Sequence, residues 1–279
     1  MKMNKKWLSL SIDADSSFQS VISSYFDYYS IGGQFNEKNV TMYFLTKHKV
    51  KVNGILNSII EKYNLSFQWG DVKLENWMDN WKDSFKPIKI DDRVMIVPDW
   101  DKNIYESDYV IKICPAMAFG TGHHESTQLV INQMLKIEIG DYSSLLDLGT
   151  GSGILSILAK KMGIDKVTAI DIDDVCEDNF YQNCKLSDID NIDIQIQDVH
   201  THEDYNYDII LANIDKNNII KILDKYQKTQ TKAIMIMAGI LISDLGEIVD
   251  CASDCSIENI DKMGEWASVM IKNKVSHHG

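Results

Sequence analysis

The segment LLDLGTGSGILSILAKK, residues 145–161, constrains the fold of this chain more than any other part of the sequence. A short apolar run ends near Asp147, glycines follow at alternate positions, and an apolar pattern with helical spacing begins near Ile154. Glycine in such a turn lets the backbone bend tightly and approach a ligand closely. The segment therefore predicts a buried strand, a ligand-binding turn and a helix. The glycines of this turn are Gly149, Gly151 and Gly153.

The next apolar run, VTAIDID, carries an acidic residue at the position that a nucleoside site requires. Asp171 follows Gly149 by about 20 residues, the separation expected across one βαβ unit for a carboxylate that binds ribose hydroxyls. The glycine spacing is GxGxG, whereas dinucleotide sites typically show GxGxxG. A carboxylate here would repel a ribose phosphate. The pattern favours an adenosine-containing ligand that carries no ribose phosphate.

A third strand pattern, DIILAN at residues 208–213, ends in Asn213. From residue 144 onward, apolar strands alternate with helical patterns, which predicts a parallel sheet with helices on both faces. Ligands bind such sheets at the carboxyl ends of the strands, where Asn213 would accept a hydrogen bond from an amine. Asparagine is also a common turn residue at strand ends, and the residues alone leave both interpretations open.

The first part of the chain has a different pattern. Residues 1–70 read as short elements in the order βαββαβ, which predicts a ferredoxin-like α+β domain. Residues 71–100 include KLENWMDNWKDSFKP, whose apolar side chains share one helical face, so we expect an ordered helical connector. Residues 101–279 would then form the α/β domain.

Several motifs together resemble the PrmA family of class I methyltransferases, which transfer methyl groups from S-adenosyl-L-methionine to protein 11 of the large ribosomal subunit. These motifs are ENWMDNWKDSFKPIKI, VPDW, AFGTGHHEST, LLDLGTGSGILSILAKK, AIDID, LANI and GEWASVMIK, in the order and spacing of that family. The resemblance implies a Rossmann-like methyltransferase domain with S-adenosyl-L-methionine as cofactor. It also implies repeated methylation of the N-terminal amine and lysine side chains of the basic ribosomal protein, with residues 1–70 recognising that substrate.

The resemblance assigns roles within AFGTGHHEST, residues 118–127. The corresponding loop of the family folds over the cofactor, and Thr127 matches its last threonine. We expect Asn213 to hold the reacting amine, which makes it the candidate catalytic residue. The cofactor-binding residues expected in total are Phe119, Thr121, Gly122, Thr127, Gly149, Gly151, Gly153, Asp171 and Asn213.

Two adjacent histidines, His123 and His124, raise the question of a metal site. Neighbouring side chains in an extended segment point in opposite directions, and metal sites need three or four converging ligands. Nothing in the sequence places His200 or His202 near this loop, so we expect no metal. His124 matches a family histidine and is a candidate general base, whereas His123 and Glu125 depart from the family pattern.

The formal net charge of −13 opposes binding to bare nucleic acid and favours encounter with a basic protein. An acidic surface also simply keeps a protein soluble. No apolar run approaches the roughly 18 residues that span a membrane, and the first residues read as a strand, not as a signal peptide. We expect a cytoplasmic protein, with a monomer as the default.

Three other classes of protein can be compared with the sequence. An NAD-dependent dehydrogenase would show GxGxxG and a hydride-transfer partner, and neither is evident. A non-enzymatic ribosome-assembly module would tolerate a degenerate cofactor loop, whereas the glycine turn, Asp171 and Asn213 are all intact. A methyltransferase of the same fold that acts on lysines of a different protein stays open, because residues 1–70 would select the substrate.

Overall fold

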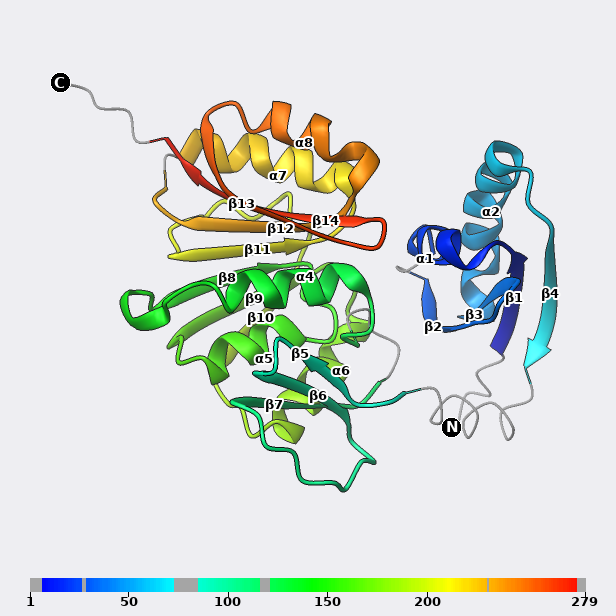
Figure 1. Cartoon of the computed structure of the whole chain (residues 1–279), viewed down its shortest axis with the longest axis horizontal. Coiled ribbons are helices and arrows are strands. Elements are labelled where there is room, and N and C mark those ends of the chain that lie inside the picture. The colour runs from blue at the N-terminus through cyan, green and yellow to red at the C-terminus, as the bar shows by residue number, and fades with distance from the viewer. Residues whose placement is uncertain (1–6, 27–28, 73–84, 116–120, 230, 275–279) are drawn as a thin grey trace. The chain divides into compact units, whose positions relative to one another are not determined.

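The computed structural model describes residues 7–26, 29–72, 85–115, 121–229 and 231–274. The chain divides into two compact units (Figure 1). The first consists of Met1–Lys86 with Pro115–Phe119, and the second consists of Pro87–Cys114 with Gly120–Gly279. Most of the expected connector helix lies outside the described residues. No helix in the described parts of the chain is both long and apolar enough to cross a membrane.

The first unit has the predicted βαββαβ order. Its sheet has the strand order β2-β3-β1-β4, and every neighbouring pair is antiparallel, as in a ferredoxin-like domain. Alternate residues of β1 are buried beneath the helices, which gives the two-residue period read from the sequence. The elements are β1 (Trp7–Asp13), α1 (Ser16–Ser24), β2 (Ser30–Phe35), β3 (Asn39–Leu45), α2 (Lys49–Tyr63) and β4 (Phe67–Val72).

The second unit contains a seven-stranded sheet of order β10-β9-β8-β11-β12-β14-β13. Five adjacent strands, β10, β9, β8, β11 and β12, run parallel to one another. Strand β14 is antiparallel to both β12 and β13. The strands are β8 (Ser144–Leu148), β9 (Lys166–Asp171), β10 (Ile192–Ile196), β11 (Ile209–Asn213), β12 (Ile234–Leu241), β13 (Cys255–Met263) and β14 (Trp266–Asn273).

Helices cover both faces of this sheet (Figure 1). Along β8, Leu145 packs into the core on one face, and Leu146 and Leu148 pack into the core on the other. Burial on both faces explains the nearly continuous apolar strands that the sequence shows. The helices on the first face are α4 (Glu125–Met134), α5 (Ile154–Lys161) and α6 (Val175–Leu186), and those on the second are α7 (Lys216–Thr229) and α8 (Leu245–Cys251).

A three-stranded sheet, β5 (Ile88–Ile90), β6 (Val94–Pro98) and β7 (Tyr109–Ile113), also belongs to the second unit. The connector expected from the sequence extends to residue 100, whereas the compact second unit begins at Pro87. The physical reason is burial: the apolar side chains of β5, β6 and β7 share one core with α5 and α6.

Candidate active site

The carboxyl ends of three neighbouring parallel strands bring the predicted residues together. The order β9-β8-β11 places the glycine turn that follows β8 between the ends of β9 and β11. Asp171 is the last residue of β9, and Asn213 is the last residue of β11. The two side chains that sequence reasoning chose from separate strands therefore lie at one edge of the sheet, the usual ligand-binding edge of this architecture.

The turn requires glycine for two distinct reasons. Gly149 and Gly153 have φ values of 80° and 81°, in the left-handed region that disfavours other residues. A Cβ atom at Gly149 would lie 2.4 Å from the side chain of Ile214, and one at Gly153 would lie 2.6 Å from the ring of Phe180. These two glycines are thus needed for packing within the protein as well as for the shape of the turn.

The glycine turn and the Asp171 carboxylate are joined directly. The backbone N–H of Gly151 donates to Asp171 Oδ2 at 2.8 Å, and the N–H of Asp173 donates to Asp171 Oδ1 at 3.0 Å. Burial raises the pKa of Asp171, and these backbone hydrogen bonds oppose that rise. Each oxygen keeps a further lone pair, so the carboxylate is oriented and still able to accept hydrogen bonds from hydroxyl groups.

Asn213 lies beside Thr127 from the first turn of α4. The Asn213 Nδ2 group donates to Thr127 Oγ1 at 3.2 Å, and both side chains are buried. Within the described residues, Asn213 Oδ1 is buried without a hydrogen-bond partner. An unsatisfied buried acceptor is costly, and the amide is oriented by Thr127 so that this oxygen is available to a ligand that donates an N–H.

His124 caps helix α4. Its Nδ1 accepts from the backbone N–H of Ser126 at 3.2 Å and lies 2.7 Å from the Ser126 hydroxyl. The ring packs edge-on against Trp266, with the two centroids 4.7 Å apart. Burial lowers the pKa of His124 to about 4, so the ring is neutral at pH 7 and too weak a base to deprotonate an ammonium group.

The described end of the preceding loop packs against other residues of the second unit, to which it belongs. Gly122 has a φ of 85°, and a Cβ atom there would lie 2.5 Å from Ile96 and 3.2 Å from Ile154. Thr121 Oγ1 lies 3.5 Å from His123 Nδ1. Phe119, which the sequence analysis also placed in the cofactor site, lies outside the described residues.

His200 and His202 take part in local hydrogen bonds. His200 Nε2 lies 2.7 Å from Asn218 Oδ1, and His202 Nε2 lies 2.7 Å from the carbonyl oxygen of Asp204. No group of three or more potential metal-binding side chains occurs among the residues that the structure describes.

Asp147, near the end of β8, is a feature that sequence reasoning did not place in the site. Its carboxylate is fully buried, and Oδ2 accepts from the hydroxyls of Thr150 and Ser156 at 2.7 Å each. Burial, with a smaller contribution from Asp171, raises the pKa of Asp147 to about 6. The acid two positions before the first glycine was visible in the sequence, but its burial was not.

Substitution of Asp147 by asparagine is expected to change how stability depends on pH. A carboxyl whose folded-state pKa is raised contributes stability that is full below about pH 4 and is lost as the pH rises through 6, about 3 kcal/mol in all. Asp147→Asn should lack this decline, as measured by denaturant unfolding between pH 4.5 and 7.5. Parallel profiles for the two proteins would contradict the burial of an ionisable carboxyl here.

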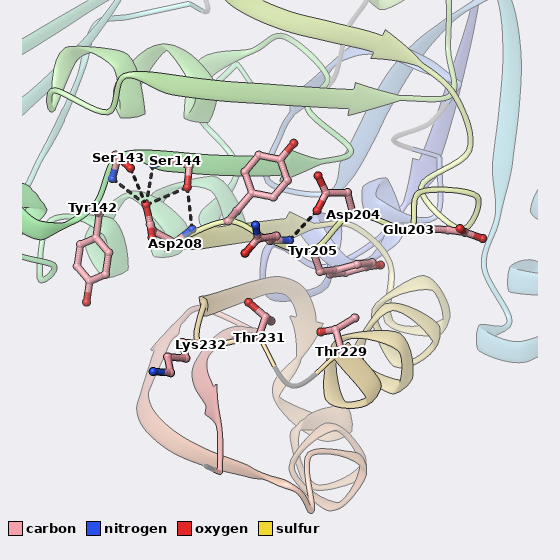
Figure 2. A pocket seen from close by; sticks show the side chains of 12 residues that line it. Tyr142, Ser143, Ser144, Glu203, Asp204, Tyr205, Asp208, Thr229, Thr231 and Lys232 are labelled. Atoms are coloured by element: carbon pink, nitrogen blue, oxygen red, sulfur yellow. Dashed lines mark hydrogen bonds between the residues drawn. The ribbon is translucent and has the colours of Figure 1, made fainter. Parts of the chain in front are cut away.

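A pocket of about 790 Å³ lies at the opposite edge of the sheet, where β8 and β11 begin (Figure 2). There Asp208 Oδ2 accepts from the backbone N–H and hydroxyl groups of Ser143 and Ser144, at 2.8 to 3.1 Å. The Asp208 carboxylate is therefore used to join the strand ends. The pocket is separate from the edge where Asp171 and Asn213 meet.

The strand order, the reversed strand β14, the glycine turn and the carboxylate at the end of β9 define a class I methyltransferase fold. The model of the ribosomal protein L11 methyltransferase (PrmA) family matches residues 9–274. The chain belongs to this family, which confirms the resemblance read from its motifs.

Individual relatives agree with this assignment. Ribosomal protein L11 methyltransferase of Clostridium botulinum is 32% identical over 259 residues, covering 91% of this chain and 80% of the relative. That of Clostridium perfringens is 34% identical over 206 residues, and the match covers 72% of this chain and 65% of the relative, just under two thirds of its length. A crystal structure of ribosomal protein L11 methylase from Lactobacillus delbrueckii subsp. bulgaricus has a TM-score of 0.62 and 27% identity, covering 67% of this chain and 98% of that one.

Proposed function

We propose that this protein methylates amines of ribosomal protein L11 with S-adenosyl-L-methionine as the methyl donor. The observation that carries the proposal is the buried, unpartnered Oδ1 of Asn213, placed at the same sheet edge as the glycine turn and Asp171. A class I methyltransferase that acts on amines needs an acceptor that orients the amine and a nucleoside site next to it. The position of Asn213 Oδ1 beside the glycine turn and Asp171 supports both assignments.

The residues at this edge fit the cofactor. The Asp171 carboxylate would bind the ribose hydroxyls, and the turn of Gly149, Gly151 and Gly153 would lie against the nucleoside. Ile172, which follows Asp171, is 55% exposed and offers an apolar surface of the kind that a purine base covers. When bound, the cofactor supplies a methyl group on a sulfonium, which is already activated for transfer.

The protein's own part in the reaction is to orient the amine and keep it neutral. Asn213 Oδ1 would accept a hydrogen bond from the amine and so direct its lone pair, while Thr127 keeps the amide in place. The buried surroundings favour the neutral form of the amine. Since the pKa of His124 is about 4, we assign this residue to capping α4, and the proton leaves to solvent.

The substrate preference agrees with the charge of the chain. A net charge of −13 attracts a basic ribosomal protein and speeds the encounter. We assign recognition of this substrate to the ferredoxin-like unit, which has its own core. Different amines of one substrate would then reach Asn213 in turn.

The rate of methyl transfer is expected to rise with pH between 6 and 9. The nucleophile must be a neutral amine, and a terminal amine has a pKa near ~8 while lysine has one near ~10.4. His124→Asn keeps a capping acceptor and removes the ring, so the shape of its pH–rate profile should match that of the wild type. A wild-type inflection that disappears in His124→Asn would restore the histidine as a base.

The direct test of the proposed function is transfer of labelled methyl groups to purified ribosomal protein L11. Label on this protein that is lost in Asp171→Ala would support both the chemistry and the substrate. Label found instead on another protein of a lysate would keep the fold and the cofactor and favour a lysine methyltransferase with a different substrate. No label and no binding of S-adenosyl-L-methionine would contradict the enzymatic function itself.

A further inference from the structure

A buried asparagine on helix α6 connects two segments that the sheet does not connect. Asn183 is fully buried, and its Oδ1 accepts from the backbone N–H of Cys114 at 2.7 Å. Its Nδ2 donates to the carbonyl oxygen of Ser152 at 2.8 Å. Cys114 follows β7, whereas Ser152 belongs to the glycine turn between β8 and α5.

A second asparagine, one helical turn earlier, reinforces this arrangement. Asn179 Nδ2 donates to the carbonyl oxygen of Cys114 at 3.0 Å, so both polar groups of that residue's backbone are bonded to amides of α6. The bond from Cys114 N–H also determines which way the Asn183 amide faces. Its donor side is thereby directed at Ser152 in the turn.

The connection continues to the proposed cofactor site. Gly151, the residue before Ser152, donates its backbone N–H to Asp171 Oδ2. A continuous series of hydrogen bonds therefore runs from Cys114 through Asn183 and the turn to the carboxylate at the end of β9. Loss of its central member would remove the hydrogen bonds to Cys114 and Ser152 and leave the turn less constrained.

We propose that Asn183 is a positioning residue that sets cofactor affinity by fixing the glycine turn against Asp171. The inference rests on the proposed cofactor site and adds a residue that contacts neither cofactor nor substrate. An amide suits this position because one side chain must both accept and donate. A carboxylate accepts only, an aliphatic side chain does neither, and a neutral carboxylic acid does both.

Because only the neutral form of a carboxylic acid can both donate and accept, an aspartate at this position provides a test that depends on pH. S-adenosylhomocysteine binding to the full chain would be measured by calorimetry for the wild type, Asn183→Leu and Asn183→Asp. Asn183→Leu should bind about 10-fold more weakly, the effect of losing one oriented hydrogen-bond system of this size. Asn183→Asp should bind weakly at pH 8 and recover as the pH falls toward 5.5, because the protonated carboxyl can again donate to Ser152.

The matched control removes two buried hydrogen bonds far from this site. In the core on the other face of the sheet, the hydroxyl of Tyr226 on α7 donates to the carbonyl oxygen of Ala233 at 2.7 Å and accepts from the backbone N–H of Asn273 at 3.2 Å. Tyr226→Phe should lower the melting temperature and leave cofactor affinity as in the wild type.

In steady-state assays, the Asn183 variants should show a raised KM for the cofactor with little change in kcat.

The outcomes separate this inference from the proposed function. Wild-type affinity in both Asn183 variants at every pH, with only a lower melting temperature, would overturn the inference and leave the function intact. If Asn183→Leu does not fold, the pH-dependent recovery of Asn183→Asp decides the question. Failure of the wild type itself to bind S-adenosylhomocysteine would instead contradict the proposed cofactor site.

Discussion

Asn213→Ala is expected to lower kcat by about 100-fold while cofactor binding changes far less. The alanine lacks the Oδ1 acceptor that we assign to the reacting amine, and the amine would then sample orientations in which its lone pair does not face the methyl group. Single-turnover methyl transfer to ribosomal protein L11 measures this loss directly. Calorimetric binding of S-adenosylhomocysteine to the same variant shows whether the cofactor site is preserved.

Thr127→Val is the matched control for this prediction. Valine keeps the volume of threonine and removes the hydroxyl that accepts from Asn213 Nδ2 at 3.2 Å. The amide then remains but is less well oriented, so the loss of kcat should be smaller than in Asn213→Ala. Turnover by Asn213→Ala at the wild-type rate would exclude this residue from the mechanism.

Asp171→Ala is expected to weaken binding of S-adenosyl-L-methionine by about 100-fold. Hydrogen bonds to a charged group contribute about 1.5–3 kcal/mol each, and the variant loses those to the ribose hydroxyls. It also leaves the backbone N–H groups of Gly151 and Asp173 without their carboxylate partner. The equilibrium dissociation constant and the KM for the cofactor should therefore rise together.

Asp193→Ala provides the control for loss of charge. Asp193 lies exposed on β10, and its carboxylate accepts a hydrogen bond from Gln195 Nε2 at 2.7 Å. The substitution removes one negative charge and leaves the glycine turn unchanged, so cofactor affinity should stay as in the wild type. Equal weakening in both variants would show that net charge, and not ribose binding, causes the effect.

The arrangement also explains why the chain can belong to this family although its loop departs from the family pattern at His123 and Glu125. Glu125 is the first residue of α4, where a carboxylate is favourable at a helix N-terminus. His124, which matches the family, supplies the cap that fixes the start of the helix. The capped start of α4 therefore places Thr127 within hydrogen-bond distance of Asn213.

The sequence by itself determined most of the elements and the sheet edge at which Asp171 and Asn213 lie. The two-residue period of β1, the apolar runs of β8 and β11 and the helical spacing of α5 are local patterns, which a reader of the sequence can recognise without knowing their neighbours. The rule that parallel strands present their carboxyl ends at one edge then brought Asp171 and Asn213 together.

Other features depended on neighbours distant in the chain. The hairpin of β13 and β14 was not predicted as strands, because β13 carries mostly polar residues at the sheet edge and pairs with β14, which in turn pairs with β12. The start of the second unit at Pro87 was decided by burial of β5 and β6 in its core.

The chemistry of individual side chains was likewise decided by tertiary structure. Burial lowers the pKa of His124 to about 4 and raises that of Asp147 to about 6, and no spacing in the sequence reports burial. The bond from Asn183 to Ser152 joins residues that are remote in sequence. Local patterns specify secondary structure because they repeat with its period, whereas solvation and hydrogen-bond partners exist only once the chain has packed.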